Sequence, residues 1–489
     1  MAIDLNAAAL DRLPEGVAGP DYDRAKLSAG IVHIGVGNFH RAHMAVYLDR
    51  LFGTGADHDW AISGAGVRPG DAKMREALEK QDFLTTVVEL DPAGLSARVT
   101  GAMIEFTEID AQKLVARMSD PAIRIVSLTV TEGGWFVDAR TGGLDTSNPD
   151  IRHDAEQPDQ PRTAFGMILA ALRRRRDAGE APFTVMSCDN LPENGHVAKQ
   201  TVVGLAKLAD PAFADWVAEN VAFPNTMVDC ITPATSDRER ALVKDRFGIT
   251  DAAPVVCEPF RQWVLEDNFP QGRPALETVG AEFVADVAPY ELMKLRILNG
   301  GHAAIAYPSA LLGHHFVHDA MADPRIRAWL EALEAREIIP TLEPIEGVDF
   351  EAYRRKVEER FSNPEIGDTI PRLCFDGWNR QPKFVLPVIR DALAAGRDVD
   401  GLALEVALWC RYCAGTNDAG EAIAPNDDNA EELKTRALAA KDDPSAFLSN
   451  ETVFGDLGRQ PAFADAFARQ LASLWNDGVA ATLELYARG

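Results

Sequence analysis

The chain has 489 residues, of which 46% are hydrophobic and 25% charged, a composition typical of soluble globular proteins and long enough for two domains. Its formal net charge of -26 argues against binding to nucleic acids or to anionic membranes, because both require a cationic surface. The N-terminus lacks the pattern of a signal peptide and no apolar run is long enough to span a membrane, so we expect a cytoplasmic protein.

The first strong pattern is an apolar strand that leads through a glycine turn into a helix. Residues 31–34 have the alternating hydrophobic pattern of a strand, and residues 41–50 have a helical pattern. The turn between them contains Gly35, Val36, Gly37, Asn38 and Phe39. Such a turn lets backbone N–H groups approach a pyrophosphate, so it predicts a dinucleotide cofactor. His40 stands where the usual fingerprint has a third glycine, which makes the motif weak on its own.

Further strands are predicted at residues 60–67, 85–90, 123–130 and 183–188. After the first of these, Asp71 would favour NAD through the ribose hydroxyls, whereas Arg68 could accept the phosphate of NADP. Ligands of open α/β sheets bind at the C-terminal ends of strands, and the residues at the ends of the last two strands are therefore candidates for the site, although either loop could be a plain turn. These residues are Thr131, Glu132, Asp189 and Asn190.

Two other segments of the first half have simpler interpretations. Residues 138–160 are polar and contain proline, which predicts a surface excursion. The basic run at residues 173–176 follows an apolar helical pattern, and the helix dipole explains it better than a binding patch does.

From about residue 285, helical patterns replace strand patterns. The sequence therefore predicts an α/β fold, with an N-terminal Rossmann-type dinucleotide-binding domain at residues 1–284 and a mostly α-helical C-terminal domain at residues 285–489. Helices of the second domain are predicted at residues 290–306, 319–336, 347–361, 383–396, 402–414, 428–440 and 461–486.

The first helix of this second domain carries three side chains of different chemistry. At about 100° per residue, Lys294 and His302 lie roughly 80° apart around the axis, with Asn299 on the same side. The other positions are mostly apolar, and a buried lysine can act as a base near neutral pH because its charged form loses hydration. Together with Asn190, which could donate hydrogen bonds to a carbonyl oxygen, this predicts alcohol oxidation with a nicotinamide cofactor and no metal. An interior helix with a snorkelling lysine is the alternative.

Other motifs compete with this interpretation. Tyr290 and Lys294 form the Y-x-x-x-K pair of short-chain dehydrogenases, but that class has the pair about 150 residues into a single domain. The histidines between residues 314 and 318 lack nearby acids, and Cys410 and Cys413 form a lone C-x-x-C, so we expect both groups to be structural. The six cysteines show no spacing of a disulfide scaffold.

Several motifs, in this order, resemble the long-chain mannitol dehydrogenase family over nearly the whole chain. They are G-V-G-N-F-H-R-A-H from Gly35, T-E-G-G from Thr131, C-D-N from Cys188, F-P-N-T-M-V-D-C-I-T-P from Phe223, E-P-F-R-Q-W-V from Glu258 and K-L-R-I-L-N-G-G-H from Lys294. The resemblance implies a zinc-independent, NAD(P)-dependent polyol or hexuronate oxidoreductase with K-x4-N-x2-H as its catalytic signature.

The resemblance also implies roles for individual residues. Lys294 looks like the general base, Asn190 and Asn299 like the oxyanion-binding amides, and Glu291 like an acid that exchanges protons with solvent. The residues expected to hold substrate hydroxyls or the outer end of the sugar chain are His302, Val228, Asp229, Arg372, Arg380 and Lys383. The implied partner is a small polyol or ketose, the implied cofactor is NAD with NADP as the alternative, and the implied state is a monomer.

The expected reaction interconverts D-mannitol and D-fructose. Within the family, a fructuronate or tagaturonate reductase and an arabinitol or sorbitol dehydrogenase are the alternatives. A non-catalytic sugar-nucleotide sensor is a further one, against which the intact Lys294, Asn299 and His302 argue. The sequence departs from the family at Cys230, where arginine is usual, and at Arg380, where lysine is common.

Overall fold

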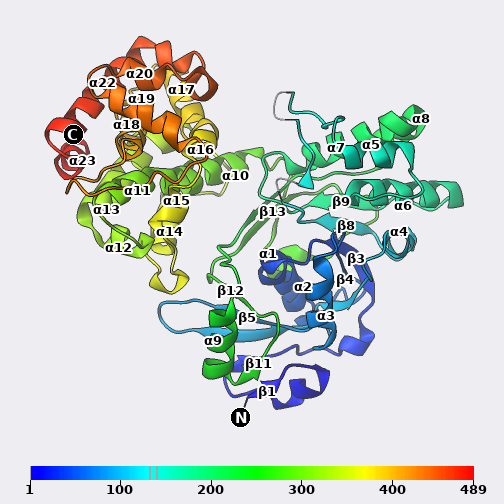
Figure 1. Cartoon of the computed structure of the whole chain (residues 1–489). Coiled ribbons are helices and arrows are strands. Elements are labelled where there is room, and N and C mark those ends of the chain that lie inside the picture. The colour runs from blue at the N-terminus through cyan, green and yellow to red at the C-terminus, as the bar shows by residue number, and fades with distance from the viewer. Residues whose placement is uncertain (1, 132–133, 139–140) are drawn as a thin grey trace. The chain divides into compact units, whose positions relative to one another are not determined.

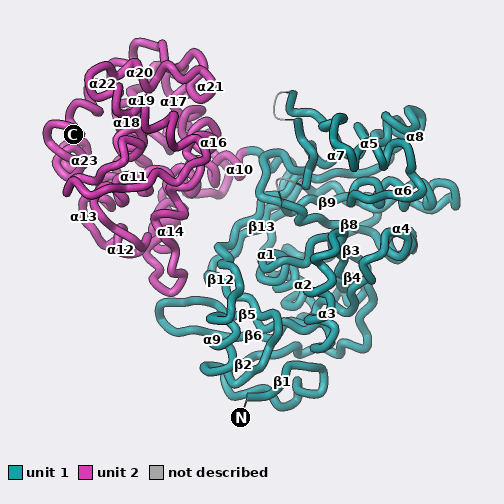
Figure 2. Tube along the Cα trace, in the orientation of Figure 1, with its two compact units in different colours: residues 1–288 teal, residues 289–489 magenta. Residues whose placement is uncertain are grey.

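The chain divides into two compact units, residues 1–288 and residues 289–489 (Figure 1, Figure 2). The computed structural model describes residues 2–131, 134–138 and 141–489. Every strand in the described part lies in unit 1, whereas unit 2 is built from helices. The predicted fold class, an α/β Rossmann-type domain followed by a mostly helical domain, is confirmed.

The strands in the described part of unit 1 form four sheets, of five, four, three and two strands. In chain order the strands are β1 (Ile3–Asp4), β2 (Val17–Ala18), β3 (Ala29–Ile34), β4 (Ala61–Ala65), β5 (Thr85–Glu89), β6 (Ser96–Thr100), β7 (Met103–Phe106), β8 (Ile125–Leu128), β9 (Thr184–Ser187), β10 (Thr226–Asp229), β11 (Ile249–Thr250), β12 (Val255–Cys257), β13 (Gln262–Glu266) and β14 (Glu282–Val284). The helices of this unit are α1 (Asn38–Ala42), α2 (Met44–Gly53), α3 (Asp71–Glu79), α4 (Ala111–Ser119), α5 (Pro149–Glu156), α6 (Ala164–Ala178), α7 (Asn194–Ala209), α8 (Pro211–Asn220) and α9 (Asp237–Phe247).

The five-stranded sheet is parallel and has the order β7-β4-β3-β8-β9. The strand order reverses between β3 and β8, and this reversal creates a crevice at the C-terminal edge of the sheet. Strands predicted at residues 31–34, 60–67, 123–130 and 183–188 are therefore confirmed, with small shifts of their ends.

The strand predicted at residues 85–90 exists as β5 but does not belong to this sheet. It lies in the four-stranded sheet of order β12-β5-β6-β2, while β7, which was not predicted, provides the missing edge of the parallel sheet. The remaining sheets have the orders β10-β13-β14 and β1-β11.

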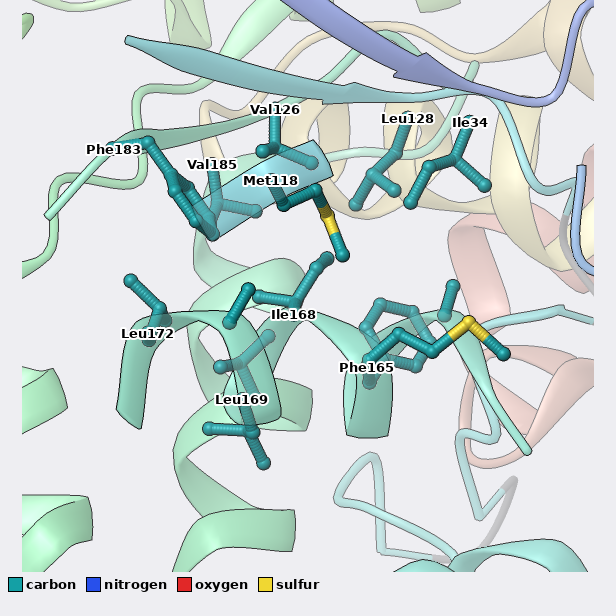
Figure 3. Packing of buried hydrophobic residues seen from close by; sticks show 14 of the residues in the cluster. Ile34, Met118, Val126, Leu128, Phe165, Ile168, Leu169, Leu172, Phe183 and Val185 are labelled. Atoms are coloured by element: carbon teal, nitrogen blue, oxygen red, sulfur yellow. The ribbon is translucent and has the colours of Figure 1, made fainter. Parts of the chain in front are cut away.

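Helix α6 covers one face of the parallel sheet. Figure 3 shows Phe165, Ile168 and Leu172 of this helix directed toward Val126 and Val185 of the strands. All five are buried in one hydrophobic cluster, and this burial provides the main stabilisation of the layer.

The ends of α6 agree with the sequence. Thr163 caps its N-terminus, and Gly179 ends it in the left-handed conformation with φ 74°. The basic run at residues 173–176 therefore lies in the last turns, as predicted, and Arg175 donates to the carbonyl of Ile123 at 2.7 Å. The segment 138–160 is only partly a surface excursion, because α5 within it buries Ile151.

Unit 2 packs its helices around α18, whose residues are buried on all sides. Its elements are α10 (Ala288–Met293), which begins one residue before the unit, the π-helical segment η5 (Lys294–Asn299), α11 (Gly300–Leu311), α12 (Val317–Ala322), α13 (Pro324–Leu333), the π-helical segment η6 (Glu334–Ile338), α14 (Phe350–Phe361), α15 (Ile370–Leu373), α16 (Gly377–Phe384), α17 (Leu386–Ala394), α18 (Asp400–Cys413), α19 (Ala430–Ala440), α20 (Ser445–Leu448), α21 (Glu451–Phe454), α22 (Pro461–Asn476) and α23 (Val479–Arg488).

Several predicted helices of unit 2 are interrupted. The helix predicted at residues 319–336 breaks at Asp323, which caps α13 ahead of Pro324. The one predicted at residues 461–486 breaks at Gly478, whose φ is 84°. In the described residues, no helix combines the length and the apolar character that crossing a membrane requires.

Helix α7 provides a test of the packing in unit 1. A Cβ added at Gly195 would lie 2.5 Å from the carbonyl oxygen of Pro224 and 2.6 Å from that of Phe223, so an alanine there must displace backbone. We expect Gly195→Ala to lower the free energy of unfolding by about 1–3 kcal/mol, as overpacking commonly does. The measurement is urea-induced unfolding followed by circular dichroism.

The matched control lies on the same helix. A Cβ at Gly204 would meet its nearest neighbour, Leu144, at 3.4 Å, which is an ordinary contact. Gly204→Ala should leave the stability unchanged or raise it by up to about 1 kcal/mol through helix propensity. Equal effects of the two substitutions would contradict the close packing of α7 at Gly195.

Candidate active site

The crevice at the reversal of strand order begins with a close approach of two loops. Gly35 follows β3 with a φ of 102°, and a Cβ there would overlap the carbonyl oxygen of Thr129, which follows β8. The Thr129 hydroxyl donates to the Gly35 carbonyl at 2.6 Å and holds the two loops together. Only glycine fits at this position, because both the conformation and the space exclude a side chain.

A pocket of about 550 Å³ opens beside this contact, a volume in the range of nucleotide and drug sites. The predicted cofactor residues that line it are Gly35, Val36, Gly37, Arg68, Asp71 and Thr131. A Cβ at Gly37 would meet only the Gly35 carbonyl oxygen, at 3.9 Å, so the surface above this turn is open. The crevice therefore has the room and the exposed backbone that a pyrophosphate requires.

Asp71 organises the loop after β4. One oxygen of its carboxylate accepts the backbone N–H groups of Val67 and Arg68, both at 2.9 Å. The Arg68 side chain remains exposed at the pocket. Arg68 and Asp71, the two residues that were predicted to discriminate NAD from NADP, thus both line the pocket.

Three other residues predicted for cofactor binding are not among the described residues that line this pocket. The Asn38 amide donates to the Pro233 carbonyl at 3.2 Å and to the Thr235 hydroxyl at 3.0 Å, and Phe39 stacks on His43. Neither Asn38 nor Phe39 is among the described residues that line the pocket, so their assignment stays a prediction. Glu132 lies outside the described residues.

His40, in place of the third glycine, points inward. Its ring stacks on His33 with the centroids 3.5 Å apart, and both rings are fully buried. Burial lowers the pKa of His33 to about 3 and the pKa of His40 well below its usual value, so both are neutral. His33 in turn bonds to Ser127 at 2.8 Å, which places this neutral pair beneath the turn.

Asp189 joins the ends of β8 and β9. Its carboxylate accepts hydrogen bonds from the backbone N–H groups of Val130 at 3.0 Å and Thr131 at 2.9 Å, and from the indole N–H of Trp135 at 3.0 Å. These bonds hold Thr131 at a φ of 67°, which costs energy in a residue with a branched side chain. Asn190, which is exposed, follows directly, so Asp189 fixes the main chain at the ends of β8 and β9, on one side of the crevice.

The strand that carries Val228 and Asp229 is connected by hydrogen bonds to the end of β9, where Asp189 lies. The Asn194 side chain donates to the Asp189 carbonyl at 3.0 Å and to the Thr226 carbonyl at 2.8 Å, linking the end of β9 to β10. Val228 and Asp229 are buried on β10, where they pair with Trp263 and Gln262 of β13.

In unit 2, the predicted catalytic helix is not a regular α-helix. The segment from Lys294 to Asn299 is π-helical, and α-helix follows from Gly300. The expected separation of roughly 80° between Lys294 and His302 is therefore wrong, because it assumes α-helical rotation through a π-helical segment. Short π-helical segments inside α-helices are frequent at functional sites, and Lys294 and Asn299 stand at the two ends of this one.

Two polar atoms of this helix lack an intramolecular partner. The Asn299 Oδ1 and His302 Nε2 atoms are buried and have no hydrogen-bond partner among the described residues. Such atoms are rare in native proteins, because leaving one unsatisfied costs about 1–3 kcal/mol. They are available to a ligand that brings hydroxyl groups.

His302 lies in a cationic environment. Its ring stacks on Phe361 with the centroids 4.1 Å apart. Burial lowers its pKa well below the usual value, and the nearby guanidinium groups of Arg372, Arg380 and Arg360 lower it further. His302 is therefore neutral and can both accept and donate.

Gly301, next to His302, stands at a position where a side chain has no room. A Cβ there would lie 2.8 Å from Oε1 of Glu334, a fully buried carboxyl group without a hydrogen-bond partner in the described part of the chain. Burial raises the pKa of Glu334 well above its usual value, so the group is neutral.

The predicted basic residues for the outer end of the substrate lie on two short helices. Arg372 of α15 is paired with Asp368, whose hydrogen bond and charge raise the pKa of Arg372 against the effect of burial. Arg380 of α16 donates to the Leu373 carbonyl at 2.7 Å, and Lys383, on the same helix, is exposed. Glu291 lies in α10, just ahead of Lys294.

Sequence reasoning missed some residues of both units. Arg162 and Thr163 line the pocket of unit 1 although they lie far along the chain, and only the position of Thr163 as a helix cap was readable. Arg360 and Phe361, beside His302, end α14, a helix whose sequence contains no motif.

Two family models match the chain. The mannitol dehydrogenase Rossmann domain matches residues 29–278, and the mannitol dehydrogenase C-terminal domain matches residues 286–475. The chain is 58% identical to the mannitol 2-dehydrogenase of Cereibacter sphaeroides over 476 residues, which are 97% of this chain and 99% of that protein.

Two solved structures are similar over nearly the whole chain. The Pseudomonas fluorescens mannitol 2-dehydrogenase in its ternary complex with NAD and D-mannitol has a TM-score of 0.85 and 43% identity, over 99% of this chain and 100% of that one. A D-sorbitol dehydrogenase in substrate-free form has a TM-score of 0.91 and 35% identity, over 98% of this chain and 100% of that one.

The bonds of Asp189 generate a prediction for binding of NADH, the expected cofactor. Asp189→Asn replaces one acceptor oxygen by an NH2 group that faces backbone donors, so the Val130–Thr131 loop loses its position. We expect NADH binding to weaken roughly tenfold, corresponding to about 1.4 kcal/mol. Quenching of protein fluorescence on titration with NADH measures this.

A matched control is Asp251→Asn. The buried Asp251 carboxylate also accepts three hydrogen bonds, from the Gln81 side chain and the backbone of Thr86 and Ala253, but it does not line the described pocket. This variant should lose stability while it keeps its affinity for NADH. If both variants bound NADH equally well, Asp189 would have no special role in the crevice.

Proposed function

The chain belongs to the mannitol dehydrogenase family, and we propose that it oxidises a sugar alcohol to the corresponding 2-ketose with NAD, most specifically D-mannitol to D-fructose. The observation that carries the proposal is the helical run of unit 2 in which Lys294 and Asn299 stand at the ends of a π-helical segment and His302 follows. Two buried polar atoms of this run have no hydrogen-bond partner among the described residues and are available to a ligand. The similarity to mannitol 2-dehydrogenases over nearly the whole chain supports the choice of substrate.

The residues of unit 1 fit a nicotinamide dinucleotide. The open surface above Gly37 and the close contact of Gly35 with Thr129 suit a pyrophosphate, and Arg68 and Asp71 would hold the adenosine end. When bound, NAD supplies the ring that accepts a hydride from the carbinol carbon. We assign cofactor binding to residues 1–284 and substrate binding chiefly to residues 285–489.

The proton chemistry belongs to side chains of this protein. Lys294 accepts the proton of the reacting hydroxyl, and Glu291 passes it on to solvent. The amide groups of Asn190 and Asn299 donate to the oxygen as it becomes a carbonyl. A base and two amide donors supply what the reaction requires, so the proposed mechanism needs no metal ion.

The rest of the substrate is a chain of hydroxyl groups. His302, Val228 and Asp229 hold those near the reacting carbon. Arg372, Arg380 and Lys383 hold the outer end. A site built from such donors and acceptors rejects substrates that leave one of them unpaired, so specificity follows from the pattern of hydroxyls.

One observation favours a second candidate, a hexuronate reductase. Three guanidinium groups, those of Arg360, Arg372 and Arg380, lie close enough to His302 to lower its pKa, and a carboxylate at the outer end of the substrate would be attracted there. Arg372 is already neutralised in part by Asp368, which reduces this attraction.

A panel of substrates separates the two candidates. We expect NADH oxidation with D-fructose, little or none with fructuronate or tagaturonate, and slower turnover when NADPH replaces NADH, because the Asp71 carboxylate disfavours a 2′-phosphate. The measurement is the decrease in absorbance of the reduced cofactor. Turnover of fructuronate with fructose inert would refute the polyol assignment.

The role of Lys294 is tested by its removal. Lys294→Ala should lower kcat by about 10²–10⁴-fold, the usual contribution of a general base, while NADH still binds with its normal affinity. Lys356→Ala is the control, because Lys356 is an exposed lysine of unit 2 that pairs with Glu359. Near-normal turnover of the Lys294 variant would exclude the lysine as the base.

A further inference from the structure

Cys230 and Cys257 lie side by side in the interior of unit 1. Cys230 directly follows β10 and Cys257 ends β12. The residues after them are joined, because the Glu258 N–H donates to the Ile231 carbonyl at 3.0 Å and the Ile231 N–H donates to the Glu258 carboxylate at 2.6 Å. The two cysteines share one buried cluster, and their side chains are hydrogen-bonded to each other.

A buried cation contacts the Cys257 sulfur. The Arg261 guanidinium donates to this sulfur from Nη2 at 3.1 Å, and its side chain is only 3% exposed. Its position is fixed by bonds from Nε to the Ala42 carbonyl at 2.7 Å and from Nη1 to Glu89 at 2.6 Å. The hydrogen bond with Cys230 and the charge of Arg261 lower the pKa of Cys257, whereas burial and the carboxylates of Glu89 and Glu258 act in the opposite direction. The lowered pKa favours the thiolate.

The other cysteines have a different environment. Burial raises the pKa of Cys374 to about 12 and that of Cys188, Cys410 and Cys413 above its usual value as well. Thiols of this kind are poor nucleophiles. Of the six cysteines, all of which the structure describes, Cys257 therefore combines a neighbouring thiol with a neighbouring cation.

We propose that Cys257 and Cys230 form an oxidation site, at which a hydroperoxide oxidises Cys257 and Cys230 then closes a disulfide. The Cys257 thiolate attacks the peroxide, the O–O bond breaks, and the departing oxygen takes up a proton and leaves as water or an alcohol. The resulting sulfenic acid is attacked by the Cys230 sulfur, the S–O bond breaks, and water leaves with the Cys230 proton. The two cysteines lose two electrons and the peroxide gains them.

The disulfide changes the segment that precedes Cys230. Asp229 is held in β10 opposite Gln262, and a covalent bond from the next residue to the end of β12 pulls on this pairing. We infer that the disulfide weakens binding of the polyol. This effect rests on the proposed role of Asp229 in substrate binding, whereas formation of the disulfide does not.

The test uses the full-length enzyme treated with hydrogen peroxide, followed by thiol alkylation and mass spectrometry of its peptides. We expect a peptide pair linked through Cys230 and Cys257, a several-fold rise in KM for the polyol, and full recovery with dithiothreitol. Cys230→Ser and Cys257→Ser should form no link and should keep their KM on treatment. Cys374→Ser, which leaves the pair intact, should remain as sensitive as the unmodified enzyme, and Arg261→Gln should react more slowly.

The outcomes separate the oxidation site from the proposed function. Absence of the linked peptide, or a rise in KM on treatment of Cys230→Ser as large as that of the enzyme without substitutions, would overturn the oxidation site. A linked peptide with an unchanged KM would overturn the inferred effect on Asp229. A linked peptide in an enzyme that oxidises no polyol before treatment would refute the proposed function alone and support the oxidation site.

Discussion

The contact between Gly35 and Thr129 is the constraint on which the cofactor half of the molecule depends. These residues directly follow the two strands between which the order of the parallel sheet reverses, and their loops touch so closely that a Cβ at Gly35 has no room. The Thr129 hydroxyl and the neutral His33 both bond to the Gly35 carbonyl, so the turn is held from below by groups whose charge does not change near neutral pH. The space above Gly37 remains open, so an anionic ligand can approach the backbone of the turn closely.

Unit 2 contributes a different kind of preorganisation. The π-helical segment after Met293 places Lys294 and Asn299 about one turn apart. The buried atoms Asn299 Oδ1 and His302 Nε2 have no hydrogen-bond partner in the part of the chain that the structure describes. Each such atom costs stability, which is acceptable where binding later satisfies it. The neutral state of His302 follows from the same burial, and it lets one ring act as donor and acceptor toward hydroxyl groups.

The sequence predicted the parts of this structure that depend on local pattern. Apolar strands at residues 31–34 and 123–130, the glycine turn and the helical texture beyond residue 285 all follow from periodicity. It did not predict β7, because a four-residue strand that contains Glu105 has no clear pattern, nor the partners of β5, because strand pairing is a long-range property. The π-helical segment was also missed, since its residues have an α-helical hydrophobic pattern.

The site was predictable where a motif marks it and not where the fold brings distant residues together. Lys294, Asn299 and His302 stand in one short signature, whereas Arg162 at the pocket and Phe361 beside His302 are unmarked. Asp189 was named by position, but its three hydrogen bonds depend on a turn that its own segment does not encode.

The central claim is that the amine of Lys294 takes the proton in the reaction, and chemical rescue tests it most directly. The measurement is the rate of polyol oxidation by Lys294→Ala in the presence of small primary amines of graded basicity and similar size. The account predicts that added amines restore turnover and that the restored rate rises with the pKa of the amine, as a general base in the transition state requires. Rescue that is absent, or that does not depend on amine basicity, would contradict it.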